Sequence, residues 1–205
     1  AGGTLDESLL ALVLANVRTP DERRGDLAAQ QSACHAGAAG WRALREREGS
    51  ARVEAGASAL LDYSERRAVA RLRELGDIEA EAEDFLEGDG VTDALVPLRV
   101  RMRVRDGRLT LDFAGTSPRV RGNVNCPVAV ARAAALFVLR SLLDDDVPTN
   151  DGIARPIEIL TPDDCVIAAR WPSAVAAGNV ETSQRITDLL FAALANAGVA
   201  APAQG

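Results

Sequence analysis

Histidine and lysine are the residue types that this sequence most clearly lacks. The chain has one histidine, His35, and no lysine, so all 23 basic residues are arginines, against 30 acidic residues and a net charge of -7. One histidine excludes a multi-histidine metal centre within the chain. A Ser-His-Asp triad would have to use His35, which lies among small helical residues without a neighbouring acid, and we interpret it as a surface or packing residue. The acidic balance disfavours nonspecific binding to nucleic acid or anionic membranes.

Cysteines and long apolar runs are also scarce. Cys34, Cys126 and Cys165 are widely separated and form no C-x-x-C pair, so neither a disulfide framework nor a cysteine zinc site is indicated. No apolar run reaches the roughly 20 residues of a membrane-spanning helix, and no basic-then-apolar signal pattern opens the chain. We therefore expect a cytoplasmic protein with reduced thiols, whose 205 residues can bury a sizeable core.

The first third of the chain carries helical signals. Thr4-x-x-Glu7 is a capping-box pattern, and a second helix is expected to begin with Thr19 as N-cap and Pro20 at its first position and to run through the forties. The first helix should have an apolar face consisting of Leu5, Leu9, Leu12 and Val13.

A third helix is predicted from near Ser64 to Leu75, ended by Gly76. We therefore expect a helical subdomain over residues 1–76 and an α+β subdomain over residues 77–205. The α+β subdomain should contain a mixed sheet with an Asp-Gly hairpin and two buried helices.

From Ile78 onward the apolar residues follow the period of a strand. Residues 98–105 alternate aliphatic side chains with arginine, Asp106-Gly107 supplies a two-residue turn, and residues 108–113 alternate again. Counting outward from the turn predicts the apolar pairs Val104–Leu109, Met102–Leu111 and Val100–Phe113.

The other face of this hairpin carries the arginines. Arg105 should meet Arg108, and Arg101 should meet and pair with Asp112. No aromatic residue is interleaved among these arginines, so we interpret the face as solvated or salt-bridged rather than as an RNA or anion surface.

The remaining elements are two helices and two short strands. Pro127 should begin a buried helix, and Asp144-Asp145-Asp146 should lie in solvent beyond its end, because three adjacent carboxylates do not converge on a cation unaided. Strands are predicted at residues 156–160 and 165–169. A last helix should bury one face and end before Gly198; that face consists of Ile186, Leu189, Leu190, Ala193, Leu194 and Ala197.

Two loop-to-helix junctions have a similar pattern, at residues 122–127 and 178–185. Each has a glycine that permits close backbone approach and an asparagine able to cap the helix that follows, and we interpret both as ordinary caps. Free N–H groups at such a start could instead bind a carboxylate, a phosphate or an oxyanion. Neither junction matches a P-loop or G-x-G-x-x-G.

Three residues are candidates for chemistry. Glu181 and Asp112 could act as acid or base, although a helix dipole and an arginine partner are sufficient structural roles for them. Cys126, just before Pro127, could be activated by a helix N-terminus, but without a histidine partner a nucleophilic role is not expected.

Four ordered segments together resemble the hydantoinase B/oxoprolinase family. They are Leu14–Leu27, Asp112–Pro127, Val147–Gly152 and Ala177–Arg185, and the resemblance covers essentially the whole chain. The loop proper of the second segment is Gly115 to Asn125. The resemblance implies a subunit of an ATP-dependent enzyme: N-methylhydantoinases and 5-oxoprolinases open cyclic amides, and acetone and acetophenone carboxylases activate ketones. It also implies a hydantoinase A-like partner that binds ATP, in a hetero-oligomer acting on a small molecule.

The resemblance further implies that the chain is an internal piece of a longer subunit. The family's His- and Asp-rich metal-binding stretch would precede Ala1 and a glycine-rich segment would follow Gly205, so ATP and a divalent metal would be held outside this chain, with no metal ligand within it. We expect the isolated piece to be inactive and name no catalytic residue. The residues expected to line or support a substrate site are Asn123, Asn125, Asn179, Glu181, Gln184 and Arg185.

Two alternatives remain open. The chain could be a noncatalytic assembly module whose helical third and hairpin hold a partner subunit or a dimer mate. Within the same family it could belong to an acetone or acetophenone carboxylase, and no feature of the sequence separates that activity from cyclic-amide hydrolysis.

Overall fold

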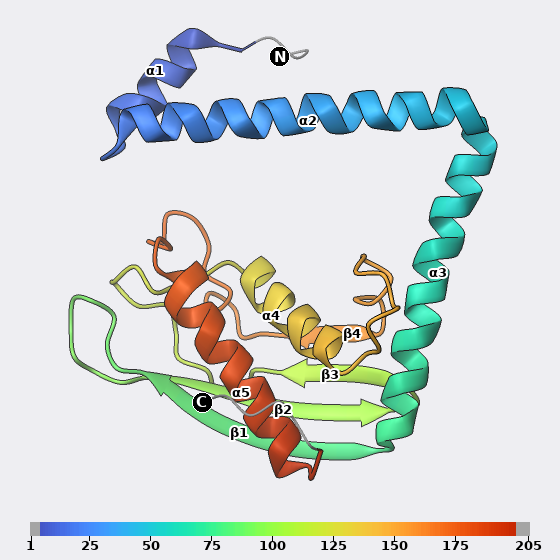
Figure 1. The fold of residues 1–205 in the computed structure, drawn as a ribbon. Coiled ribbons are helices and arrows are strands. Elements are labelled where there is room, and N and C mark those ends of the chain that lie inside the picture. Colours follow the sequence, from blue (N-terminus) through green and yellow to red (C-terminus); the bar gives the residue numbers. More distant parts are fainter. Residues whose placement is uncertain (1–4, 200–205) are drawn as a thin grey trace. The chain divides into compact units, whose positions relative to one another are not determined.

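The computed structural model describes residues 5–199, and by spatial contacts the chain divides into two compact units, Ala1–Ala57 and Ser58–Gly205. Figure 1 shows the elements of both units. The dividing point lies within a helix, whereas the sequence-based division at residues 76 and 77 follows the change from helix to strand. Within residues 5–199, no helix combines the length and apolarity needed to cross a membrane.

The first unit contains α1 (Glu7–Ala15) and α2 (Pro20–Glu48). Asp6 caps α1, with Oδ1 accepting from the amides of Ser8 at 3.0 Å and Leu9 at 3.1 Å. The Thr4 of the expected capping box lies outside the described residues. The helix turns Leu10 and Leu14 inward, whereas the residues of its expected apolar face are exposed: Leu5, Leu9, Leu12 and Val13. The predicted start of α2 at Thr19 and Pro20 is confirmed, although the Thr19 side chain makes no capping bond.

The third helix, α3, begins much earlier than predicted, since it spans Ser50–Leu75. Its added first half is rich in alanine, a strong helix former, so the helix forms without a cap at Ser64. Ser64 is fully buried in mid-helix, where its hydroxyl accepts from the Asn150 amide at 2.9 Å. The predicted end is confirmed, because Gly76 has φ +76°.

A four-stranded sheet forms the centre of the second unit, in the order β1 (Ile78–Leu86), β2 (Val96–Arg105), β3 (Arg108–Asp112) and β4 (Ile157–Leu160). The hairpin register is confirmed, with Met102 opposite Leu111 and Val104 opposite Leu109. Asp106 and Gly107 both have positive φ, as a tight two-residue hairpin turn requires. The α+β prediction is therefore confirmed.

β4 runs parallel to β3, and α4 (Val128–Ser141) makes the crossover between them. The strand predicted at residues 165–169 does not form: only Cys165 makes an isolated bridge, to Pro118. This segment bonds instead to the loop before α4, where the Cys126 amide donates to the Val166 carbonyl at 2.7 Å and the Cys126 carbonyl accepts from the Ala169 amide at 3.0 Å.

The two helices α4 and α5 (Ser183–Asn196) cover one face of the sheet (Figure 1). α5 buries the predicted face, and Gly198 follows its end with φ +76°. α4 is buried along Ala131, Ala135 and Leu139, but its opposite side leaves Phe137 59% exposed, so the expectation of burial holds for one side only.

The other face of the sheet carries a ladder of ion pairs. Arg101 lies opposite Asp112 as predicted, but its ion pair is with Glu81 on β1, at 2.6 Å. Asp112 instead accepts from the amide of Ala114. The prediction of a salt-bridged face is confirmed. The predicted partner of Arg101 was wrong, because β1 also pairs with β2 and places Glu81 opposite Arg101.

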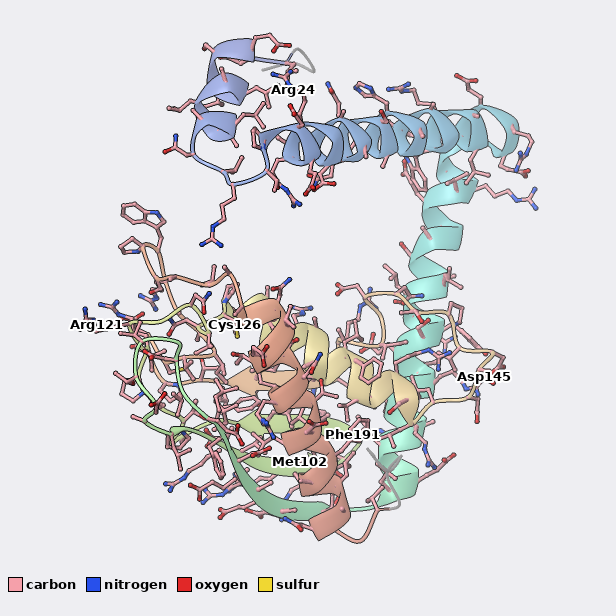
Figure 2. All side chains as sticks on the ribbon, turned by 60° about the vertical axis from the view of Figure 1, so that its left-hand side comes forward. Arg24, Met102, Arg121, Cys126, Asp145 and Phe191 are labelled. Carbon is pink, nitrogen blue, oxygen red and sulfur yellow. The ribbon has the colours of Figure 1, made fainter. Side chains whose placement is uncertain are left out.

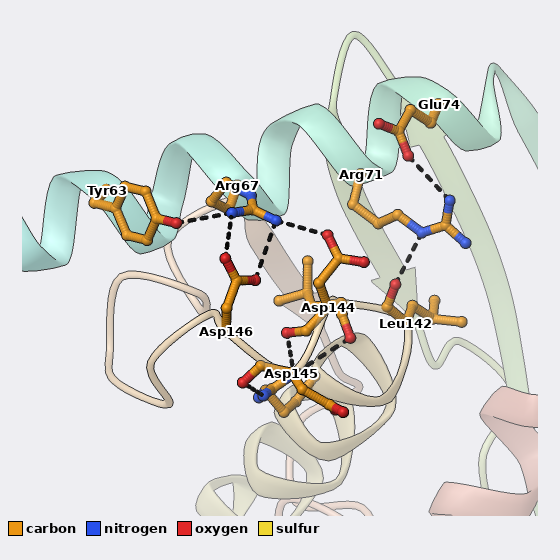
Figure 3. A network of polar contacts seen from close by, with 10 residues as sticks. Tyr63, Arg67, Arg71, Glu74, Leu142, Asp144, Asp145 and Asp146 are labelled. Carbon is orange, nitrogen blue, oxygen red and sulfur yellow. Dashed lines mark hydrogen bonds and ion pairs between the residues drawn. The ribbon is translucent and has the colours of Figure 1, made fainter.

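The acidic triplet is held by arginines. Arg67 of α3 donates to Asp144 at 2.6 Å, to Asp146 at 3.2 Å and to the Tyr63 hydroxyl at 2.7 Å (Figure 3). Chiefly because of the bond to Asp146, the pKa of Arg67 is raised. The triplet therefore anchors the loop after α4 to α3.

Candidate functional site

The two loop-to-helix junctions that the sequence singled out pack directly against each other. The Ala177 amide donates to the Asn123 carbonyl at 2.9 Å, and the Thr182 hydroxyl donates to the Val124 carbonyl. Figure 2 labels Cys126 on the first junction and Arg121, the residue just before it, which points outward. Segments more than fifty residues apart thus form one structural unit.

Asn125 joins the junctions from within. It is fully buried; its Oδ1 accepts from the Val120 amide at 2.8 Å, and its Nδ2 donates to the carbonyls of Val120, Gly122 and Ala174 at 2.8–3.0 Å. Both polar atoms of the side chain are therefore satisfied by the protein. Of the two expected roles, lining or supporting a site, this geometry matches support.

The interpretation of the two asparagines as helix caps is wrong. Pro127 occupies the N-cap position of α4, and Ala177 that of the π-helical turn η1 (Gly178–Thr182), and no side chain caps either start. Asn125 turns inward to the junction, and Asn179 is exposed on η1. A π-helical turn of this kind often marks a functional site.

Close backbone approach at the two glycines is confirmed. A Cβ atom at Gly178 would lie 2.0 Å from the Asn125 carbonyl oxygen. A Cβ atom at Gly122 would lie 1.6 Å from the carbonyl oxygen of Asp89, a residue on the loop after β1. Both positions therefore require glycine.

A pocket of about 370 Å³ lies beside the paired junctions. One wall is the loop from Leu86 to Asp93, and the other is the start of α5. The pocket brings together three of the six predicted site residues, Glu181, Gln184 and Arg185, and adds Asp188.

The other predicted residues lie around this pocket. Asn125 is buried directly after Val124, which lines the pocket, and Asn123 is exposed, with its Oδ1 3.9 Å from where a Cβ atom at Gly90 would lie. Asn179 lines a neighbouring groove of about 770 Å³ between α4 and α5, into which Gln184 and Asp188 also reach. Gln184 and Asp188 therefore connect the pocket and the groove.

Carboxylates dominate the electrostatics of the pocket. Arg185 is its one arginine, and its guanidinium is 3.2 Å from the Asp84 carboxylate of β1. Four lining carboxylates make no ion pair within residues 5–199: Glu87, Asp93, Glu181 and Asp188. The pocket therefore favours ligands that donate hydrogen bonds and disfavours ligands with several negative charges.

Cys126 is unsuited to nucleophilic chemistry, as expected. It is fully buried, and desolvation, followed by the nearby Cys165, raises the pKa of its thiol to about 12. The thiol therefore stays protonated near neutral pH.

Metal-binding clusters do not form within residues 5–199: no three His, Cys, Asp or Glu side chains gather suitably. His35 lies in the first unit, where it lines a pocket between α1 and α2. These residues alone therefore do not fit the divalent metal that the family resemblance implies.

The segment from Val147 to Gly152 has a structural role. Asn150 donates to the Ser64 hydroxyl and accepts from the Gly152 amide, both at 2.9 Å, and a Cβ atom at Gly152 would lie 2.1 Å from the Leu61 carbonyl oxygen. This motif docks the loop before β4 onto α3.

Asp89 was missed by the sequence reasoning. Its carboxylate accepts from backbone amides on both its own loop and the first junction, and these bonds, from Thr92, Val91 and Gly122, lower its pKa to about 2. The available signal was the spacing Gly88-Asp89-Gly90, a turn pattern directly after a strand.

The structure thus defines an α+β domain with a carboxylate-lined pocket where two helix starts meet. The family model for hydantoinase B/oxoprolinase matches residues 1–205, and the chain belongs to this family. It is 35% identical over 192 residues to an uncharacterized protein of Methanocaldococcus jannaschii, covering 94% of this chain and 33% of that protein. It is 34% identical over 191 residues to a putative D-/L-hydantoinase subunit of the B type from Pseudomonas sp. (strain NS671), covering 88% and 32%.

A solved structure has the same fold. The ATP-dependent caprolactamase from Pseudomonas jessenii matches 96% of this chain and 34% of its own with a TM-score of 0.77, at 23% sequence identity. The matched segment spans about a third of the length of the archaeal relative and of the hydantoinase relative.

Proposed function

We propose that this chain is part of the B-type subunit of an ATP-dependent hydrolase that opens cyclic amides of the hydantoin or 5-oxoproline type. ATP would be handled by a separate A-type subunit in a hetero-oligomer. Family membership supports the class of reaction, and the names of the hydantoinase relative and of the caprolactamase fit the substrate class.

The observation that carries the proposal is the meeting of Glu181, Gln184 and Arg185 in one pocket at the paired junctions. A cyclic amide presents N–H donors and carbonyl acceptors on one small ring. The Glu181 carboxylate would accept from a ring N–H, and the Gln184 amide would donate to a ring carbonyl. Polar groups placed in this way select a substrate with matching donors and acceptors.

The negative charge of the pocket supports the proposal that a partner subunit binds ATP. The four lining carboxylates without an ion pair in the described chain would repel the phosphates of ATP. We therefore place ATP binding, and the divalent metal that the family resemblance implies, outside this chain.

The test uses the full-length subunit with its ATP-binding partner. Glu181→Ala and Gln184→Ala should each reduce ATP-coupled ring opening by about 10- to 100-fold, as expected for removal of a substrate-positioning group. Glu158→Gln, at an exposed carboxylate on β4, is the matched control and should be active. Normal turnover in both pocket variants would remove these residues from the site, and normal turnover in Asn125→Ala would remove its supporting role.

The noncatalytic alternative is favoured by one specific observation. Leu9 and Leu12 of α1 are 58% and 62% exposed, an apolar surface suited to binding another chain. If the chain is only an assembly module, it should coelute with the ATP-binding subunit on a sizing column, and the pocket variants should leave ring opening unchanged.

A further inference from the structure

Asp89 lies behind the wall of the pocket rather than in it. It is 4% exposed, and the residues on both sides of it, Gly88 and Gly90, line the pocket. Its Oδ1 accepts from the amides of Val91 at 2.9 Å and Thr92 at 2.7 Å, which closes the loop on itself. Its Oδ2 accepts from the Gly122 amide at 2.9 Å. One carboxylate oxygen therefore binds amides of its own loop, and the other binds the first junction.

The contact between Asp89 and Gly122 admits little adjustment. The missing side chain at Gly122 leaves room for the Asp89 backbone, since a Cβ atom there would lie 1.6 Å from the Asp89 carbonyl oxygen. The Asp89 amide in turn donates to the Thr92 carbonyl at 3.1 Å. The loop after β1 is thus held against the first junction by backbone packing and by a charged hydrogen bond.

The first junction also makes hydrogen bonds toward the other wall of the pocket. The Gly122 carbonyl accepts from Asn125, which also binds the Ala174 carbonyl, and Thr182 donates to Val124 on the same junction. Thr182 is the residue after Glu181. These hydrogen bonds, connected through the backbone of residues 122–125, therefore join the Asp89 loop to the turn that carries Glu181.

We propose that Asp89 is a positioning residue of the candidate site, which sets the separation between the loop after β1 and the start of α5. It acts through Gly122 without touching the substrate. This inference rests on the proposed function, because the ligand it positions is the cyclic amide. The simpler role is a local turn stabiliser, which would need only the bonds to Val91 and Thr92.

Asp89→Asn separates the two roles. An asparagine retains one carbonyl oxygen for the amides of Val91 and Thr92, so the local turn can persist. Its NH₂ group would face the Gly122 N–H, and two donors cannot bond. The variant therefore removes the bond between the loops and keeps the turn.

The experiment measures kcat and KM for a hydantoin or 5-oxoproline substrate with the full-length subunit and its ATP-binding partner. Asp89→Asn should raise KM by about 10- to 100-fold, with a much smaller change in kcat, because both walls still exist but no longer hold the ring in place. Amide hydrogen exchange over residues 88–93, 121–125 and 181–184 should accelerate about tenfold or more. Asp106→Asn, in the tight turn at the opposite end of β2, is the control and should change neither readout.

Three outcomes would overturn the inference. In the first, Asp89→Asn accelerates exchange only over residues 88–93 and leaves KM unchanged, which would make Asp89 a local turn residue. In the second, the Gly122 amide of the wild-type protein exchanges as fast as exposed loop amides, a measurement that remains decisive if the variant does not fold. In the third, kcat falls with KM unchanged. If the wild-type complex opens no cyclic amide, the proposed function fails, and exchange over residues 181–184 in Asp89→Asn decides whether Asp89 couples the two walls.

Discussion

Replacing Gly178 by alanine tests the packing on which the candidate site depends. The added methyl group would lie 2.0 Å from the Asn125 carbonyl oxygen and 2.7 Å from the Cys126 Cβ. The two junctions would have to separate by about 1.4 Å to restore an ordinary contact of 3.4 Å to that oxygen. That separation would strain the bonds from Ala177 to Asn123 and from Thr182 to Val124.

The expected loss follows from these two effects. Overpacking a close contact costs about 1–3 kcal/mol, and each weakened hydrogen bond adds up to about 1 kcal/mol. Gly178→Ala should therefore lower the free energy of unfolding by about 2–4 kcal/mol, which lowers Tm by about 4–16 °C for a domain of this size. Calorimetry and urea unfolding of the chain measure both quantities.

Gly56→Ala is the matched control. Gly56 lies in α3 with no atom near its added Cβ, and alanine favours a helix by about 0.5–1 kcal/mol, so this variant should be as stable as wild type or slightly more stable. If Gly178→Ala unfolds within about 0.5 kcal/mol of wild type, well below the cost of overpacking, the close packing of the junctions is refuted.

Three further predictions concern the core, acid stability and thiol reactivity. Phe113→Ala, at a fully buried position, should cost about 3–5 kcal/mol in urea unfolding, and a loss below about 1 kcal/mol would contradict its place in the core. The folded-state pKa of Asp89 is about 2, below the ordinary value of 3.8, so its contribution to stability is present above about pH 4 and is lost as the pH falls toward 2. Asp89→Asn should therefore make the midpoint of urea unfolding depend less on pH over that range. An unchanged pH dependence in the variant would refute this contribution. Iodoacetamide at about pH 8 should label exposed Cys34 and spare buried Cys126, as read by mass spectrometry; rapid labelling of native Cys126 would contradict its burial and raised pKa.

The correct predictions were those that depend on neighbouring residues. The hairpin register follows from Asp106-Gly107 and the alternation on either side of it, and the last helix follows from its 3.6-residue period. The need for glycine at 122 and 178 was also predicted, although not which atoms would approach them. Glu181, Gln184 and Arg185, which the family resemblance indicated, line one pocket, and their role in binding a substrate stays a prediction.

The wrong predictions share a dependence on distant partners. The segment at 165–169 has strand composition, but its backbone bonds to the loop before α4 instead of to the sheet. Arg101 had a carboxylate opposite on each neighbouring strand, and only the sheet order shows that it pairs with Glu81. Asn125 lies two residues before Pro127, the N-cap of α4, and its buried side chain makes four hydrogen bonds in place of a capping bond.

The sequence by itself determined the elements whose hydrogen bonds and apolar faces are local: the Asp-Gly hairpin, the helix that begins at Pro20 and the helix that ends at Asn196. Only the tertiary structure decided that the junctions at 122–127 and 178–185 pack against each other and that Asp89 ties a third loop to them. Those contacts join residues more than thirty positions apart. Their hydrogen bonds depend on the packing of the whole sheet and its helices, which no local pattern encodes.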